Sequence, residues 1–508
     1  MPLPRRTRAA LYGCTCAALL VTAYLVAPTA SAQPETPDPA EQCADNGPHL
    51  RYVVLFAPGT EPAEADAEIT AGCGATTAYY PQIGVAIATS ADPGFGDRFG
   101  PSRAVSAQRE TLARRGLASP DLTAPNLTLV GDAGRTDLAA EQWDMTMIGA
   151  DRARLTNPGD HRVVVGVLDS GIDADHPELA EAVDPSLSAG CLTGAPDPTP
   201  SAWAPTVSPH GTHVAGTIAA ADDGVGITGV APGVRLAAIK VVDDDGHIYP
   251  EYVVCGFMWA AEHGIRVTNN SYVVDPWSLT CRDRPREQVA HEAVRRAVTH
   301  ATSRGVLTVA ATGNDGLDLA RFRGRTVDGG EEIRWVDNHC DALPAELPGV
   351  VGVAAVGPDR VKTSYSSYGL GVVDVVAPGG DSDSAGGKNC VLSTVPGGYD
   401  HLCGTSMATP HVSGVAALLA STHPDATPDQ LTRLLGEQAT PLPCPEDYDR
   451  NADGVQDAVC HGSPEFNGFH GHGMVNALAA VSGGTSTPVD TTATPTGTTT
   501  SSEEVTPR

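Results

Sequence analysis

Short apolar, β-branched runs recur along this chain at intervals long enough to hold a helix, and this alternation constrains the fold most. The run at 163–168 is apolar throughout and ends in Asp169-Ser170-Gly171. A strand without a polar face is typical of a parallel sheet that is covered on both sides. Further strands of this kind are expected at 234–242, 265–268, 305–311, 350–356 and 372–377.

Amphipathic segments lie between these runs. In one of them the apolar residues share a single helical face at 3.6-residue spacing, namely Ala290, Val294, Ala297, Val298 and Ala301. Alternating strands and helices predict an α/β domain over 141–482, with a doubly wound, mostly parallel sheet flanked by helices.

Three polar residues stand where such a fold builds its sites. Asp169 ends a buried strand, His210 precedes an apolar helix, and Ser406 precedes the apolar run 407–420. A helix N-terminus has unpaired N–H groups and a favourable dipole, so it suits a serine whose attack on a carbonyl creates an oxyanion. Taken singly, the serine is equally explained as a helix cap and the aspartate as a turn residue.

Three segments that contain these residues resemble the signature blocks of the subtilase family, in the same order. They are Asp169-Ser170-Gly171-Ile172-Asp173, His210-Gly211-Thr212-His213-Val214-Ala215-Gly216 and Gly404-Thr405-Ser406-Met407-Ala408. The resemblance implies a subtilisin-like fold and a catalytic triad in which His210 is the base for Ser406 and Asp169 orients the histidine. Relatives that replace this histidine by glutamate are excluded by His210.

The resemblance also implies an oxyanion donor. The strand that ends before Gly313-Asn314 resembles the family's oxyanion-hole segment, which assigns Asn314 as the donor, helped by the backbone N–H of Ser406. An asparagine in a turn before Asp315-Gly316 is the structural alternative.

Two extended segments align with the walls that hold substrate in the family, and a third with the pocket floor. The walls give Gly246, Ile248, Ser271, Tyr272 and Val273 as substrate-binding residues, and the floor is expected at 342–345. Ile248 and Val273 stand where relatives frequently have glycine, so they either narrow the pockets or redirect the strands. No acidic cluster marks a preference for basic residues.

No cofactor is implied for the chemistry, but structural calcium is. Glu178 and Asp223, with the loop 222–229, align with a calcium site of many subtilases, where carboxylate and carbonyl oxygens bind the ion. A second acidic segment, 449–454, matches half of an EF-hand loop but has Cys460 at position twelve. An acidic turn closed by a disulfide explains it equally well.

The N-terminus reads as an export signal followed by a small domain. Arginines at 5, 6 and 8, an apolar stretch at 9–27 and Ala30-Ser31-Ala32 predict a signal peptide over 1–32, with an uncleaved anchor as the alternative. Strands at 51–56 and 84–88 around a helix at 62–71 give an α+β unit over 33–100 that resembles an inhibitory propeptide. A linker with the maturation site is expected at 101–140; a retained N-terminal domain is the alternative.

The cysteine content and the net charge also constrain the class of protein. Ten cysteines follow the signal, an even number that indicates disulfides in an exported protein. Cys444–Cys460, Cys390–Cys403 and Cys43–Cys73 are the expected local pairs. A net charge of -29 argues against a nucleic-acid partner. The Thr/Ser/Pro-rich segment 483–508 is expected to be disordered and carries no apolar anchor.

Together these features predict a secreted, monomeric serine endopeptidase, made as an autoprocessed proenzyme that acts through an acyl-enzyme. Its partners would be polypeptide substrates and its own propeptide, with no nucleic acid and no membrane span after signal removal. A catalytically silent scaffold that binds a partner, and a protease dedicated to one substrate, are the alternatives.

Overall fold

The computed structural model describes residues 43–114, 131–132, 136–328, 332–383 and 389–483. The expected signal peptide at 1–32 and nearly all of the expected tail at 483–508 lie outside these ranges. So does much of the expected linker at 101–140, in which the maturation site was placed.

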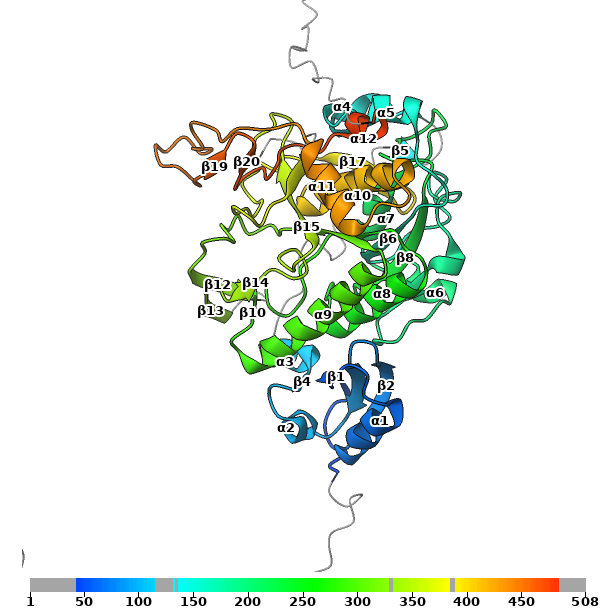
Figure 1. Cartoon of the computed structure of the whole chain (residues 1–508), viewed down its shortest axis with the longest axis vertical. Helices are drawn as coiled ribbons and strands as arrows, with labels where there is room; N and C mark the ends of the chain where they lie inside the picture. The colour runs from blue at the N-terminus through cyan, green and yellow to red at the C-terminus, as the bar shows by residue number, and fades with distance from the viewer. Residues whose placement is uncertain (1–42, 115–130, 133–135, 329–331, 384–388, 484–508) are drawn as a thin grey trace, which may run out of the picture. The chain divides into compact units, whose positions relative to one another are not determined.

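A seven-stranded parallel sheet forms the centre of the large domain (Figure 1). Its strand order is β16-β15-β11-β9-β6-β8-β7, and every neighbouring pair is parallel. The strands are β6 (Val164–Asp169), β7 (Ala189–Gly190), β8 (Arg235–Lys240), β9 (Val267–Asn270), β11 (Leu307–Ala311), β15 (Val350–Val356) and β16 (Val375–Pro378). Six of the seven were expected from apolar runs; β7 has two residues, too few to show a pattern.

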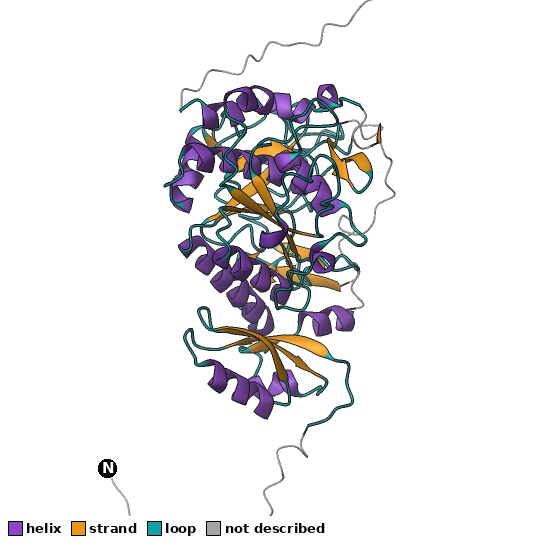
Figure 2. Cartoon of the chain, turned by 90° about the vertical axis from the view of Figure 1, so that its right-hand side faces the viewer, coloured by secondary structure: helices purple, strands orange, loops and turns teal. Residues whose placement is uncertain are grey.

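Helices cover both faces of this sheet, which confirms the doubly wound α/β prediction (Figure 2). Helices α7 (His210–Ala219) and α10 (Thr405–Thr422) share one apolar core with one face of the sheet. Helices α8 (Pro250–Glu262) and α9 (Pro285–Ser303) share the core on the other face. The expected apolar face of α9 is buried there, because all five of its residues are at most 1% exposed.

The remaining elements of the large domain are short apart from one helix. They are α4 (Trp143–Met147), α5 (Ala150–Thr156), α6 (Pro200–Trp203), α11 (Pro428–Glu437), α12 (Ala477–Val481), the 3-10 turns Ala139–Glu141 and Pro185–Leu187, and the strands β5 (Gly131–Asp132), β10 (Thr280–Cys281), β12 (Gly324–Asp328), β13 (Glu332–Val336), β14 (Cys340–Asp341), β17 (Val391–Val395), β18 (Gly398–Leu402), β19 (Gly462–Ser463) and β20 (Phe466–Asn467).

The N-terminal region folds as the small α+β unit that the sequence predicts. Its antiparallel sheet has the order β2-β3-β1-β4. The elements are β1 (Leu50–Leu55), α1 (Pro62–Ala71), β2 (Ala75–Tyr80), β3 (Val85–Ser90), α2 (Phe95–Phe99), β4 (Ala104–Val105) and α3 (Ala107–Arg114). Because β4 pairs with β1, this unit continues past residue 100, where the sequence analysis ends it.

The two faces of the N-terminal sheet have different neighbours. Successive side chains of a strand point to opposite faces. Tyr52 and Val54 therefore pack inside the small unit, whereas Val53 and Leu55 join the core around α8 and α9. Arg296 of α9 also donates to the carbonyl oxygens of Phe56 and Ile83, at 2.8 and 3.0 Å.

Disulfides link several of these elements. The expected pairs Cys390–Cys403 and Cys444–Cys460 are present, and Cys191–Cys255 and Cys281–Cys340 join residues far apart in sequence. Cys43 and Cys73 are disulfide-bonded as well. All ten cysteines in the described part of the chain are thus oxidised.

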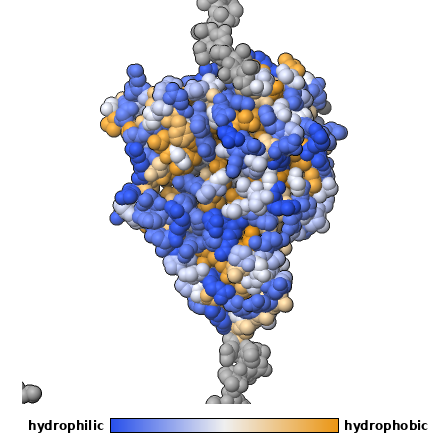
Figure 3. Space-filling model, viewed as in Figure 1, coloured by the Kyte–Doolittle hydropathy of each residue, from blue (hydrophilic) through white to orange (hydrophobic). Residues whose placement is uncertain are grey.

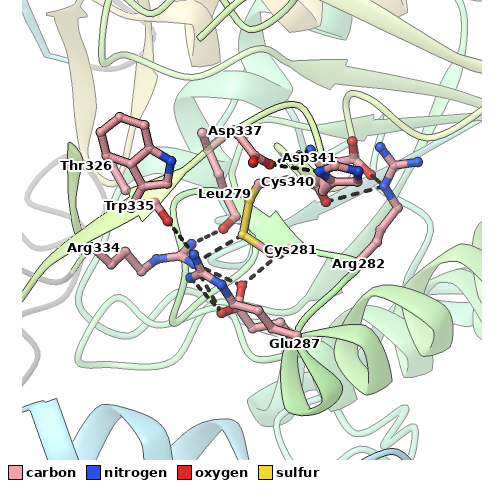
Figure 4. The surroundings of a disulfide bond; sticks show 12 residues. Leu279, Cys281, Arg282, Glu287, Thr326, Arg334, Trp335, Asp337, Cys340 and Asp341 are labelled. Atoms are coloured by element: carbon pink, nitrogen blue, oxygen red, sulfur yellow. Dashed lines mark hydrogen bonds and ion pairs between the residues drawn. A yellow bond between two sulfur atoms is a disulfide. The ribbon is translucent and has the colours of Figure 1, made fainter. Parts of the chain in front are cut away.

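The Cys281–Cys340 bond lies beside a buried ion pair (Figure 4). Glu287 at the start of α9 accepts from the backbone N–H of Cys281 at 2.7 Å and from Arg334 of β13 at 3.0 Å. Losing one member of a buried, hydrogen-bonded pair leaves an uncompensated charge, which is costly. The disulfide and the ion pair together fix β10, β13 and β14 to the first turn of α9.

The visible surface mixes hydrophilic and hydrophobic residues (Figure 3), as surfaces of folded proteins normally do. A search of the described helices found no span with the length and apolar character needed to cross a bilayer.

The disulfide Cys191–Cys255 ties the segment after β7 to α8, and both residues are fully buried. We expect the double variant Cys191→Ala, Cys255→Ala to lose about 2–4 kcal/mol of unfolding free energy, because the open chain gains entropy mainly when unfolded. Urea unfolding followed by tryptophan fluorescence measures this loss. An unchanged midpoint would show that the bond adds nothing to stability.

Candidate active site

Asp169 and His210 form a buried pair at the end of the central sheet. Asp169 is the last residue of β6, and His210 is the first of α7. The Nδ1 atom of His210 lies 2.8 and 3.0 Å from the two carboxylate oxygens of Asp169. Only 3% of His210 and 1% of Asp169 is exposed, so the pair is shielded from water.

The first turn of α7 is fixed against the segment that follows β6. The N–H of Gly211 donates to the hydroxyl of Ser170 at 3.0 Å. A Cβ atom on Gly211 would lie 2.3 Å from the carbonyl oxygen of Gly171 and 3.1 Å from the Cβ of Asp169. Only glycine allows this approach, which sets the position of the His210 ring relative to the carboxylate.

Ser406 lies in the first turn of α10, next to Asn314. Its hydroxyl donates to the carbonyl oxygen of Ser271 at 3.0 Å. The Oδ1 atom of Asn314, just beyond β11, accepts from the N–H and hydroxyl of Thr405 at 2.9 and 2.8 Å. The amide nitrogen of Asn314 lies 3.3 Å from where a Cβ on Gly404 would be, so this side chain faces the start of α10.

The carboxyl ends of three neighbouring strands bring these residues to one edge. In the order β11-β9-β6, the strands are followed by Asn314, followed by Ser271, and ended by Asp169. Parallel strands end at the same edge, where α/β proteins build their sites. Helices α7 and α10, which carry His210 and Ser406, pack side by side.

The two expected substrate walls are held together by Asp275. Its carboxylate accepts from the N–H of Ile248 at 2.8 Å, and its own N–H donates to the carbonyl oxygen of Ile248 at 2.9 Å. Gly246 precedes this contact in a turn with φ +83°, a conformation that favours glycine. The two segments therefore adjoin at Ile248 and Asp275.

The side chains of these walls point in different directions. Ile248 and Tyr272 are 1% and 4% exposed and lie in the core around α8, so only their backbones can meet a substrate. Ile248 therefore does not narrow a pocket with its side chain. Val273 is half-buried, and its Cγ2 atom lies 3.6 Å from the Cβ position of Gly313. The N–H of Val274 donates to Leu343, in the expected pocket floor, at 3.0 Å.

Glu178 lies against the loop 222–229, since a Cβ atom on Gly226 would be 2.1 Å from its Oε1 atom. Its Oε1 atom accepts from the hydroxyl of Tyr399 at 2.7 Å, and its buried Oε2 atom has no hydrogen-bond partner among the described residues. Burial, with a smaller contribution from nearby Asp223, raises the pKa of this carboxyl to about 7, although the hydrogen bond from Tyr399 acts in the opposite direction. A buried carboxylate with an unused oxygen beside a loop fits a cation.

Two other histidines of the signature blocks have structural partners. The Nε2 atom of His213 lies 3.1 Å from the carbonyl oxygen of Val391, and burial lowers its pKa to about 3. His411 pairs with the buried carboxylate of Asp144 at 2.9 Å. Both side chains are thus held by partners within the fold.

Sequence reasoning missed Thr405 and Tyr399. Thr405 lies inside a signature block, so its hydroxyl was a detectable candidate for a second polar contact. Tyr399 lies 221 residues from Glu178 on β18, and no local pattern in the sequence connects them.

The geometry defines a class of protein: a doubly wound α/β fold with a buried His–Asp pair, and a serine at a helix N-terminus on the same sheet edge. A model of the subtilase family matches residues 160–473. Fervidolysin of Fervidobacterium pennivorans is 33% identical over 322 residues, 60% of this chain and 41% of that protein. Subtilisin NAT of Bacillus subtilis subsp. natto is 36% identical over 283 residues, 55% of this chain and 61% of that protein.

A solved structure gives the same fold. The epidermin leader peptide processing serine protease of Staphylococcus aureus superposes with a TM-score of 0.62 at 20% identity, over 87% of this chain and 99% of that one. The chain thus belongs to the subtilase family, a family of serine-type endopeptidases. It spans about half the length of the first curated relatives that it matches.

Proposed function

We propose that this protein is a serine endopeptidase that hydrolyses peptide bonds through an acyl-enzyme. The observation that carries the proposal is the buried His210–Asp169 pair. It lies at the sheet edge where α10 begins, with Ser406 in the first turn of that helix. Family membership supports it. A buried carboxylate that orients a histidine, together with a serine at a helix N-terminus, is the arrangement that activates this weak nucleophile.

The four residues have distinct roles in this mechanism. Ser406 Oγ attacks the substrate carbonyl carbon while His210 Nε2 takes its proton, and Asp169 stabilises the imidazolium that forms. Asn314 and the Ser406 N–H donate to the carbonyl oxygen as it becomes negative. His210 then protonates the leaving amine as the C–N bond breaks. Water attacks the acyl-enzyme in the same way and releases the acid.

We propose further that the N-terminal unit is a propeptide that acts as intramolecular inhibitor, followed by the maturation segment. The apolar face of β1 and the Arg296 contacts, which join it to α8 and α9, support this role. Oxidation of all ten described cysteines supports an extracellular location, because disulfides persist in oxidising compartments. Glu178, Asp223 and their loop would hold a structural calcium ion.

Ser406→Ala tests the proposed chemistry. Without the nucleophile, peptide hydrolysis should fall by about 10⁶-fold, the loss recorded for the corresponding change in subtilisin. The precursor should also stay untrimmed between about Ala118 and Ala140. Mass spectrometry of the purified protein and a fluorogenic peptide assay measure both. Ser421→Ala, a partly buried serine of the same helix, is the control. Normal trimming of the Ser406→Ala chain would mean that another protease matures it.

Calcium should stabilise the fold, and more at pH 8 than at pH 5. The pKa of Glu178 is raised from 4.5 to about 7 in the folded chain. Without the ion, the contribution of this carboxyl to the free energy of unfolding is therefore present below pH 4.5 and is lost as the pH rises through 7. The ion removes this loss. Free calcium at 100-fold its dissociation constant adds about 2.7 kcal/mol, hence several degrees of Tm. Glu178→Gln should lose the response to chelator, and an equal response in both proteins would exclude this site.

Val273→Gly tests the pocket. Because the Val273 side chain lies opposite Gly313, it should exclude large aromatic P1 residues. Pockets discriminate by roughly 1–3 kcal/mol per methylene, so kcat/KM for a P1 Phe peptide should rise at least about tenfold, with little change for P1 Ala. Ile248→Val, a conservative change in the core, is the control. Equal losses for P1 Ala, Leu and Phe peptides would contradict a narrowed pocket.

A further inference from the structure

A line of buried hydrogen bonds runs from the middle of α10 through β9 and back to Ser406. The hydroxyl of Ser413 donates to Asn269 Oδ1 at 2.8 Å, and Asn269 Nδ2 donates to the hydroxyl of Ser271 at 2.9 Å. The hydroxyl of Ser271 then donates to the carbonyl oxygen of Ser406 at 2.8 Å. Ser413, Asn269 and Ser271 are at most 1% exposed, so water does not compete for these bonds.

The direction of each bond is fixed by the one before it. Asn269 accepts through its oxygen and must donate through its nitrogen. Since Ser271 receives that N–H, its own hydrogen is left for the carbonyl oxygen of Ser406. The Ser406 hydroxyl returns a bond to the carbonyl oxygen of Ser271 at 3.0 Å. Ser271 and Ser406 are thus joined in both directions.

A proline explains why Ser406 needs this donor. In a regular helix the carbonyl of Ser406 would accept from the N–H of residue 410. Residue 410 is Pro410, inside α10, and proline has no N–H. Ser271, directly after β9, supplies the missing donor at this one carbonyl, so the first turn of α10 is tied there to the end of β9.

The same bonds reach the substrate wall. Ser271 is followed by Tyr272 and Val273, the wall segment described above. A shift of Ser271 would therefore move the nucleophile and the wall together. A line of bonds that merely satisfied buried polar groups would stabilise the fold without governing the reaction rate.

We propose that Asn269 and Ser413 are positioning residues, which hold the Ser271 hydroxyl as the donor that fixes the Ser406 turn against the substrate wall. This inference rests on the proposed function of Ser406. Neither residue touches substrate. Both act through Ser271, so their effects on kcat depend on the presence of the Ser271 hydroxyl.

A double-mutant cycle tests the proposal. Asn269→Ala should lower kcat for a peptide substrate by about tenfold or more, since small displacements of reacting groups are costly. In the Ser271→Ala background the same change should have almost no further effect on kcat, because the link to Ser406 is already broken. Ser413→Ala, which removes one hydrogen bond only, should act in the same direction with a smaller loss, and it serves if Asn269→Ala folds poorly.

Ser188→Ala is the matched control. Ser188 precedes β7 and is fully buried, and its hydroxyl donates to the carbonyl oxygen of Asp184 and accepts from the N–H of Ala238, both at 2.9 Å and outside this line. It should lower Tm at least as much as Ser413→Ala but leave kcat nearly unchanged. Equal kcat in Asn269→Ala and wild type, or kcat losses that add in full with Ser271→Ala, would overturn the positioning role.

Labelling with a serine-reactive phosphonate separates the two levels of inference. The rate of Ser406 modification should fall in Asn269→Ala and stay near wild type in Ser188→Ala. If wild type neither cleaves peptides nor reacts, the proposed function fails. If wild type reacts and Asn269→Ala reacts equally fast, only the positioning role fails.

Discussion

Parallel pairing of β11, β9 and β6 is the constraint on which the rest of the structure depends. The strands are far apart in sequence, yet pairing in one direction places their carboxyl ends along one edge. Asn314, Ser271 and Asp169 follow or end these strands, so hydrogen bonds between backbones decide which side chains are neighbours. The helices that bring His210 and Ser406 begin at the same edge because parallel strands deliver the chain there before it runs back along a helix.

Because this edge of the sheet is buried, polar groups that lie there need hydrogen-bond partners. A buried polar group without a hydrogen bond costs roughly 1–3 kcal/mol. At the nucleophile, Pro410 removes a helical donor, and Ser271, directly after β9, replaces it. At Glu178, one carboxylate oxygen is bound by Tyr399 while the other is left to a cation in our proposal. At Ser406 and at Glu178, a polar group is thus bound by a residue that is distant in the sequence.

The sequence predicted most elements of the large domain because a strand buried on both faces and a helix with one apolar side have clear patterns. It missed β7, which has two residues, and β4, whose pairing with β1 extends the N-terminal unit beyond residue 100. It predicted the local disulfides Cys390–Cys403 and Cys444–Cys460 but not Cys191–Cys255, whose residues are 64 positions apart. A sequence pattern predicts structure over about the length of one helix or strand. The more distant partners of a strand or a cysteine depend on how the elements pack.

The fold class, the family and the three blocks that contain Asp169, His210 and Ser406 follow from the amino-acid order, since each block is local and has a recognisable pattern. The direction of the wall side chains emerges only from the folded chain: Ile248 and Tyr272 enter the core, while Val273 faces Gly313. The line of bonds from Ser413 to Ser406 through Asn269 likewise emerges only there. In extended segments without a repeating pattern, the direction of a side chain depends on which distant element packs against it, and this is settled only when the chain folds.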